Sequence, residues 1–249
     1  MTSNGDGRRR GWRRRLRGAI AACACVLLPP AGYVGYRQAV DNFGTVVPGR
    51  VYRSDQMTGA SMTRAVRAYG VKTVLNLRGP NPSAGWYRDE LAASTAAGAT
   101  QVDISMSSCE WMSRAQLRAL VRVLDTCEYP LLIHCQWGAE RTGLVSAFSE
   151  LLRPGSTLDD ARRQFSVGYM FLPVKDGKVM LAHLAAYEGW LRAGGRTHSP
   201  GRFREWAESG FTPGVPSREQ WPYDPYPLVT VTRPAPEALA AAKARGERR

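Results

Sequence analysis

The segment from Leu131 to Gly143 holds the residues whose types and spacing could carry out chemistry. Cys135 directly follows a short apolar run and one histidine, and Arg141 lies six residues further on. Gly138 allows a tight turn, and the apolar run 144–152 predicts a helix. A strand, a short loop and a helix N-terminus form an anion cradle, because loop N–H groups and the helix dipole both supply positive potential.

This arrangement suits a cysteine that attacks phosphate esters. A thiol at this place should ionise readily, since the same N–H groups and dipole stabilise its thiolate. Arg141 can form two parallel N–H bonds with a tetrahedral oxyanion, which a lysine cannot do. Together these groups indicate phosphoryl transfer through a cysteinyl-phosphate. The alternative is a buried structural cysteine at the end of a strand.

The same residues resemble the signature loop of the cysteine-based protein tyrosine phosphatases, in the form used by dual-specificity enzymes. The family's loop reads His-Cys-x-x-Gly-x-x-Arg-Thr/Ser-Gly, and residues 134–143 meet every fixed position. Tyr52-Arg53-Ser54 and Asn76-Leu77-Arg78 are similar to elements of the atypical dual-specificity phosphatases of plants, fungi and bacteria. The resemblance covers residues 43–194 and implies a protein tyrosine phosphatase-like fold.

The resemblance also implies roles for the loop residues. Cys135 is the expected nucleophile and Arg141 the expected phosphate clamp. Thr142 can donate its hydroxyl to the sulfur and help the thiolate leave, and His134 is expected to order the loop backbone. The phosphate-binding backbone N–H groups are expected from Gln136, Trp137, Gly138, Ala139, Glu140 and Arg141.

The general acid that protonates the leaving oxygen stays open among three carboxyl groups. Many relatives use an aspartate about thirty residues before the cysteine, and Asp103 lies at such a spacing. Glu110 lies on the following loop, and Glu140 matches relatives that place an acid directly before the arginine. The spacing narrowly favours Asp103 over Glu140. Any such acid needs a raised pKa to be protonated near neutral pH. A fourth alternative is that no protein acid acts and the enzyme prefers good leaving groups.

The expected substrate is a phosphorylated protein or a small phosphomonoester. Relatives with a lysine between the loop glycine and the arginine differ from this chain, where Ala139 and Glu140 add a negative charge. That difference disfavours a highly anionic substrate, although a phosphoinositide or inositol phosphate remains an alternative. Trp137 either lines the rim of the phosphate-binding loop, where it could stack on a phenyl ring of the substrate, or merely packs against the protein.

Two other functions compete with a phosphatase. A rhodanese-like sulfurtransferase also uses a cysteine loop on an α/β sheet, but Arg141 and the two residues after it disfavour that class. A membrane-tethered pseudophosphatase that only binds phosphorylated ligands is the other alternative, and the intact Cys135 and Arg141 disfavour it.

The net charge of +13 over 249 residues lies mainly in the tails. Residues 1–18 carry seven arginines and one aspartate, and residues 233–249 carry five basic and two acidic groups. No basic stripe interleaved with aromatic residues lies between them, so nucleic acid is not an expected partner. Five irregularly spaced cysteines and three histidines give neither a disulfide framework nor a metal pattern, and no cofactor is expected.

An uncharged run over residues 18–36 follows the N-terminal arginines. Its length approaches that of a membrane-spanning helix, which predicts an anchor with the catalytic domain outside the cytoplasm. A cleaved signal peptide of a secreted or periplasmic protein and a soluble basic arm are the alternatives. The predicted segments are a basic cytoplasmic arm at 1–17, a transmembrane or signal segment at 18–36, a phosphatase-like domain at 37–195 and a partly disordered extension at 196–249.

Strand and helix signals alternate along the predicted domain. Strands are predicted at 71–77, 100–104 and 131–133, after a turn at Pro48-Gly49 with a short edge strand. A Ser113–Gln116 capping box opens one helix, and Thr58 or Ser61 could cap another. Further helices are predicted at 86–97, 144–152 and 179–191. This alternation predicts an α/β fold with a mostly parallel central sheet flanked by helices, preceded by the N-terminal apolar helix.

Overall fold

The computed structural model describes residues 23, 25–219 and 226–246 of the chain. The chain divides into two compact units, Met1–Val40 and Asp41–Arg249. In the first unit, residues 25–39 are helical.

The residues that the structure describes do not support the predicted transmembrane helix over residues 18–36. In the described part of the chain, no helix is both long and apolar enough to cross a membrane. Residues 18–22 and 24 of that segment, and the whole basic arm 1–17, lie outside the described residues. The limits of the four predicted segments stay predictions.

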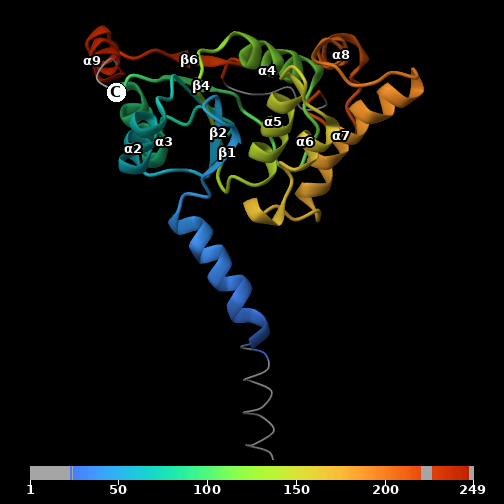
Figure 1. The fold of residues 1–249 in the computed structure, drawn as a ribbon, viewed down its shortest axis with the longest axis horizontal. Helices are drawn as coiled ribbons and strands as arrows, with labels where there is room; N and C mark the ends of the chain where they lie inside the picture. The colour runs from blue at the N-terminus through green and yellow to red at the C-terminus, as the bar shows by residue number, and fades with distance from the viewer. Residues whose placement is uncertain (1–22, 24, 220–225, 247–249) are drawn as a thin grey trace, which may run out of the picture. The chain divides into compact units, whose positions relative to one another are not determined.

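Among the described residues, six strands form one sheet in the order β1-β2-β5-β3-β4-β6 (Figure 1). The strands are β1 Gly44–Val47, β2 Val51–Ser54, β3 Thr73–Asn76, β4 Thr100–Asp103, β5 Leu131–His134 and β6 Thr230–Thr232. The four central strands run parallel, whereas β1 is antiparallel to β2 and β6 is antiparallel to β4. The α/β class is confirmed, but the prediction of a mostly parallel sheet is wrong, because the sheet is mixed.

The two antiparallel edges have different causes. A tight turn at Pro48-Gly49 joins β1 to β2, and Gly49 takes the positive φ of 69° that this turn requires. Strands joined by so short a turn can only be antiparallel. β6 comes from the tail beyond Thr212, for which the sequence predicted no strand.

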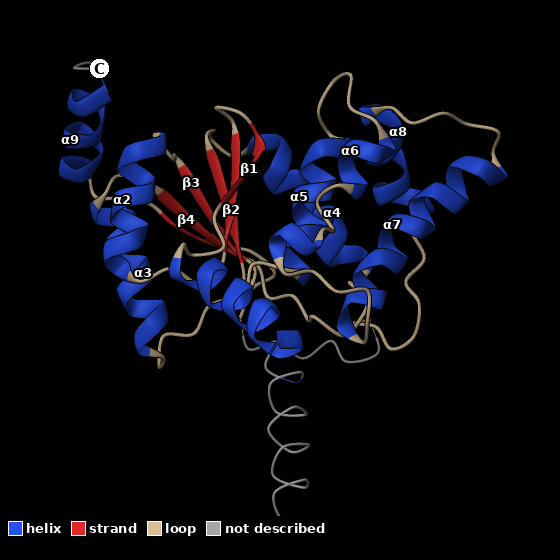
Figure 2. Ribbon diagram, turned by 60° about the horizontal axis from the view of Figure 1, so that its bottom comes forward, coloured by secondary structure: helices blue, strands red, loops and turns tan. Residues whose placement is uncertain are grey.

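Helices cover both faces of the sheet (Figure 2). Successive strand side chains point to opposite faces. Leu75 and Ile133 therefore pack with the helices of one face, α4, α5 and α7. Val74 and Leu132 pack with α2 on the other face. The helices are α2 Gly59–Tyr69, α3 Gly85–Ala96, α4 Arg114–Thr126, α5 Glu140–Leu151, α6 Leu158–Arg162, α7 Asp176–Ala193, α8 Pro200–Glu205 and α9 Pro236–Gly246, with a short 3₁₀ helix η1 Val167–Tyr169 and a short π-helix η2 Trp206–Gly210.

Side-chain caps fix where two helices begin. The predicted capping box of α4 is confirmed, since the Gln116 N–H donates to Ser113 Oγ at 3.0 Å and the Ser113 N–H donates to Gln116 Oε1 at 2.9 Å. Of the two candidates for α2, Thr58 is the N-cap, and its Oγ1 accepts from the Ser61 N–H at 3.2 Å. The cap of α4 fixes the end of the loop that leads from β4, which borders the candidate site.

Candidate active site

Cys135 directly follows β5, at the carboxyl end of the parallel strands. β5 lies between β2 and β3, so its loop is flanked by theirs, at the edge where parallel sheets bind ligands. α5 begins at Glu140, which leaves only residues 135–139 between strand and helix. Cys135 is 1% exposed. The predicted order of strand, short loop and helix is confirmed, and it places the thiol beside a helix N-terminus.

Gly138 is the tight point of this loop. Its φ is +66°, a conformation that residues with a side chain rarely adopt. A Cβ at this position would lie 2.6 Å from the Ser54 carbonyl oxygen and 2.8 Å from the Asp55 nitrogen. The loop therefore passes so close to the end of β2 that only glycine fits.

Gly138→Ala should destabilise the protein by about 2–4 kcal/mol, because the strain of positive φ and a backbone clash act together. Gly49→Ala is the matched control, since Gly49 has φ +69° with open space around it. That control should cost only about 1 kcal/mol. Thermal unfolding of both variants measures the difference, and equal melting temperatures would contradict the close approach of the loop to β2.

Carbonyl groups of the loop are held from outside, and this determines where its N–H groups point. A trans peptide bond directs its C=O and N–H to opposite sides, so an anchored carbonyl turns the next N–H into the loop. This contact pattern gives the predicted cradle of donors a physical cause. The anchoring donors are the Gln56 N–H for Gln136 (3.2 Å), Asn42 Nδ2 for Trp137 (2.9 Å) and Arg53 Nη2 for Gly138 (2.8 Å).

Arg53 on β2 is one of these anchors, and it has no exposed surface. Besides the loop, it donates from Nη1 to the Gln164 carbonyl at 2.7 Å. Its guanidinium lies 3.9 Å from the ring centroid of Tyr169. The sequence singled out Tyr52-Arg53-Ser54 as a family element but gave Arg53 no role. The structure shows that this side chain supports the loop.

The surroundings of Cys135 favour its thiolate. Burial alone would raise the pKa of the thiol. The positive charge of Arg141, the Thr142 hydroxyl and the N–H groups of Thr142 and Trp137 outweigh burial, so the pKa of Cys135 lies below its ordinary value. The Thr142 hydroxyl oxygen is buried and forms no hydrogen bond to a nitrogen or oxygen atom of the described residues. It is therefore available to the sulfur.

The guanidinium of Arg141 is bound to the protein through one nitrogen, and another of its nitrogens can still bind a ligand. Its Nη1 donates to the Met106 carbonyl at 3.2 Å and the Leu77 carbonyl at 3.4 Å, which lie beyond β4 and β3. Its Nε is buried and has no hydrogen-bond partner within the described ranges. A buried donor without an acceptor is costly, so this atom indicates a place for an anionic ligand.

His134 lies directly behind the thiol in a buried ion pair. Its Nε2 is 3.1 Å from Glu90 Oε1, and both side chains have no exposed surface. Burial would lower the pKa of His134, but the Glu90 carboxylate raises it above the ordinary value. Its Nδ1 faces the Cys135 carbonyl oxygen at 3.4 Å. The sequence did not single out Glu90, whose position on α3 is far from the loop in the chain.

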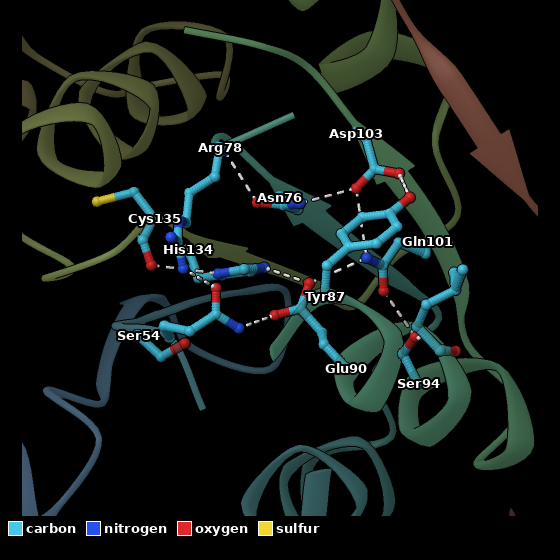
Figure 3. A network of polar contacts seen from close by, with 12 residues as sticks. Ser54, Asn76, Arg78, Tyr87, Glu90, Ser94, Gln101, Asp103, His134 and Cys135 are labelled. Carbon is cyan, nitrogen blue, oxygen red and sulfur yellow. Dashed lines mark hydrogen bonds and ion pairs between the residues drawn. The ribbon is translucent and has the colours of Figure 1, made fainter. Parts of the chain in front are cut away.

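Asp103 belongs to a buried polar network rather than to the surface of the loop (Figure 3). Its carboxylate accepts hydrogen bonds from Tyr87 OH at 2.8 Å and from Asn76 Nδ2 at 2.9 Å. Burial raises the pKa of Asp103, against the hydrogen bonds that lower it. Figure 3 shows the Cys135 sulfur pointing away from this network. Both oxygens are engaged and no part of the side chain is exposed, so the placement does not suit the general acid that the spacing favoured.

Of the two other candidate acids, Glu110 forms an ion pair and Glu140, among the described residues, does not. Glu110 Oε2 lies 3.0 Å from Arg218 Nε in an ion pair with the C-terminal segment. Glu140, the first residue of α5, is half-buried and forms no salt bridge within the described part of the chain. Of the remaining loop residues, Ala139 is buried, whereas Gln136 and Trp137 are exposed. Trp137 is 50% exposed and thus lies on the surface at the rim.

No curated protein matches the chain in sequence. Among solved structures, TpbA of P. aeruginosa with one cysteine replaced by serine, in complex with pTyr, is similar with 18% identity and a TM-score of 0.48. That match covers 68% of this chain and 92% of the other. A putative phosphatase (DUF442) from Shewanella putrefaciens has 17% identity and a TM-score of 0.47, with 61% and 97% covered. The catalytic domain of the PP-IP phosphatase SIW14 from S. cerevisiae, in complex with citrate, has 21% identity and a TM-score of 0.43, with 60% and 94% covered.

Residues 34–152 match the sequence model of the tyrosine phosphatase family. The matched segment runs from before β1 to the end of α5 and includes the whole loop around Cys135. This match indicates that the chain is similar to the cysteine-based protein tyrosine phosphatase-like superfamily over these residues.

Proposed function

We propose that this protein hydrolyses phosphate monoesters through a cysteinyl-phosphate formed on Cys135. The observation that carries the proposal is the buried, unpartnered Nε of Arg141 beside a thiol of lowered pKa. The anchored carbonyls of Gln136, Trp137 and Gly138 add inward N–H groups around the same point. A nucleophile and donors converging on one place are what phosphoryl transfer needs.

The reaction proceeds in two displacements at phosphorus. In the first, the Cys135 sulfur forms a bond to phosphorus while the ester P–O bond breaks, and the leaving oxygen takes up a proton. In the second, the oxygen of a water bonds to phosphorus and gives a proton to the group that protonated the leaving oxygen, while the S–P bond breaks and inorganic phosphate leaves. The Thr142 hydroxyl stabilises the departing thiolate by donating to it, and Arg141 binds the charge of the phosphoryl oxygens in both steps.

The loop after β4, where Glu110 lies, is held by the C-terminal segment and α7. The Trp111 N–H donates to the Pro216 carbonyl and the Arg218 N–H donates to the Trp111 carbonyl, both at 3.0 Å. The Met112 N–H donates to His183 Nε2 at 3.1 Å. Glu110 is already paired with Arg218, so a movement that delivered it to a substrate would break several contacts.

Glu140 is therefore our candidate for the general acid. It lies on the same short loop-to-helix junction as Cys135 and directly precedes Arg141. It is half-buried and has no salt bridge to another described residue. Asp103, which the spacing favoured, has both oxygens occupied by buried donors.

Glu140→Gln should lower the rate about a hundredfold on an alkyl phosphate but less than about tenfold on p-nitrophenyl phosphate, since only a poor leaving group needs the proton. Asp103→Asn and Glu110→Gln serve as controls and should lower both rates in parallel, if at all. The assignment to Glu140 fails if its variant keeps the leaving-group dependence of the parent enzyme.

Aryl phosphates such as phosphotyrosine are the proposed substrates, with phosphoserine and phosphothreonine next. The exposed Trp137 ring on the rim supports this order, because a phenyl group can stack on it. The test is turnover of a panel of phosphopeptides, phosphoinositides and phenyl phosphate by the full chain, with acid-quenched protein checked for phosphate on Cys135. Binding of these ligands without turnover would instead support a pseudophosphatase.

A further inference from the structure

Arg78, in the loop after β3, is a second arginine at the site, and three contacts hold it in place. Its guanidinium carbon lies 3.5 Å from the ring centroid of Trp86. Its Nη1 donates to Gln56 Oε1 at 2.9 Å, and its backbone N–H donates to Asn76 Oδ1 at 2.9 Å. The ring of Trp86 and the amide of Gln56 hold the planar guanidinium, and Asn76 holds the backbone that carries it. The guanidinium is therefore ordered before any ligand arrives.

Gln56 connects this arginine to the phosphate loop. Its Nε2 donates to Glu90 Oε2, and a carboxylate can only accept, so the amide oxygen must face Arg78. Its backbone N–H donates to the Gln136 carbonyl of the loop at 3.2 Å. The buried Glu90 therefore sets the orientation of the amide that holds Arg78 beside the loop.

Arg78 and Arg141 lie close together around the thiol. Arg141 Nη1 donates to the carbonyl of Leu77, the residue directly before Arg78. Burial lowers the pKa of Arg78, and the positive charge of Arg141 lowers it further, while the charges of Glu90 and Cys135 raise it. Within the described residues, Arg78 forms no salt bridge with a carboxylate. Two guanidinium groups that repel each other would both be stabilised by oxyanions bound to the pair.

The transferred phosphoryl group already has its partners in the loop N–H groups and in Nε of Arg141. Arg78 is thus left for a different group of the substrate. Resting on the proposed function, we propose that Arg78 is a specificity-determining residue that binds a second oxyanion, a carboxylate or a phosphate, carried by the substrate next to the scissile phosphate ester. A guanidinium suits both groups, because its parallel N–H bonds match their paired oxygens.

Three phosphonates that cannot be hydrolysed at the P–C bond test this proposal. Methylphosphonate has one anionic group, phosphonoacetate adds a carboxylate and methylenebisphosphonate adds a second phosphonate. Calorimetric titration of the full chain should show that at least one of the two doubly anionic ligands binds at least about tenfold more tightly than methylphosphonate. The ligand that gains the most identifies the second group as carboxylate or phosphate.

Arg78→Gln should reduce that preference to less than about threefold, and Arg78→Lys should leave an intermediate preference, because lysine keeps the charge without the fork. Arg122→Gln, an exposed arginine on α4, controls for net charge and should keep the full preference. Any of three results would overturn the proposal: the unaltered chain shows no preference for a doubly anionic ligand, the preference survives in Arg78→Gln, or Arg122→Gln removes the preference as fully as Arg78→Gln does.

Turnover of phenyl phosphate by the unaltered chain separates this proposal from the proposed function. Turnover without a preference for doubly anionic ligands would refute only the role of Arg78. A preference that depends on Arg78 without any turnover would refute the phosphatase and leave Arg78 as part of an anion-binding site. Melting temperatures of the variants show that each is folded, and Arg78→Lys carries the test if Arg78→Gln does not fold.

Discussion

Cys135→Ser should reduce hydrolysis of an aryl phosphate by at least about 10⁴-fold, to near the background rate. The structure lowers the pKa of the thiol through Arg141, Thr142 and inward N–H groups, which outweigh burial. A serine hydroxyl in the same place stays protonated near neutral pH, so it is a far poorer nucleophile than the thiolate. Steady-state kinetics with p-nitrophenyl phosphate measures the loss.

Binding should survive in the same variant, because the Arg141 side chain and the loop N–H groups are unchanged. Cys127→Ser is the matched control, since burial raises the pKa of that thiol to about 11 and it lies at the end of α4. The control should keep the parent rate. Residual activity above about one hundredth of the parent rate in Cys135→Ser would refute a covalent intermediate on this residue.

The local parts of the site could be predicted from sequence because neighbouring residues determine them. Cys135, Gly138 and the start of α5 follow one another within a few residues, so their types and spacing alone indicate a strand, a turn and a helix. The capping box of α4 is equally local, since Ser113 and Gln116 are one helical turn apart. Such signals do not depend on the rest of the fold.

The residues that hold the loop could not be predicted, because they come from distant parts of the chain. Asn42 is 95 residues from Trp137, and Arg53 is 85 residues from Gly138. Glu90 on α3 reaches His134 only because strand and helix pack together. Hydrogen bonds of this kind depend on sheet order and register, which the sequence pattern does not specify.

Asp103 shows why spacing along the chain is a weak guide to geometry. A count of residues before the cysteine says nothing about which face of a strand a side chain occupies. In the sheet, Asp103 is aligned with Asn76, and Asn76 is aligned with His134, so all three belong to one row across β4, β3 and β5. Asn76 donates to Asp103 within that row. Asp103 therefore belongs to the buried polar network that ends at His134, directly before the phosphate-binding loop.

The strand at one edge of the sheet was predicted and the strand at the other edge was not, because only the first has a local sequence signal. The Pro48-Gly49 turn is a local signal, and it correctly predicted a strand at this edge. β6 has only three residues, none of them buried, and it pairs with β4 across more than one hundred residues of chain. A short exposed strand has no alternating pattern long enough to identify it.

Arg141→Lys should lower kcat by about 10²–10³-fold, because the donors lost are those that strengthen in the transition state. A lysine can place one charge near the phosphoryl group but cannot donate from a fixed plane while also holding the Met106 and Leu77 carbonyls.

KM for p-nitrophenyl phosphate should change much less than kcat, since ground-state binding also uses the loop N–H groups. Arg153→Lys is a suitable control, because Arg153 lies two residues after the end of α5 and pairs with Glu150, away from the loop. A kcat loss of less than about tenfold in Arg141→Lys, or an equal loss in Arg153→Lys, would show that the buried Nε of Arg141 does not bind the transferred phosphoryl group.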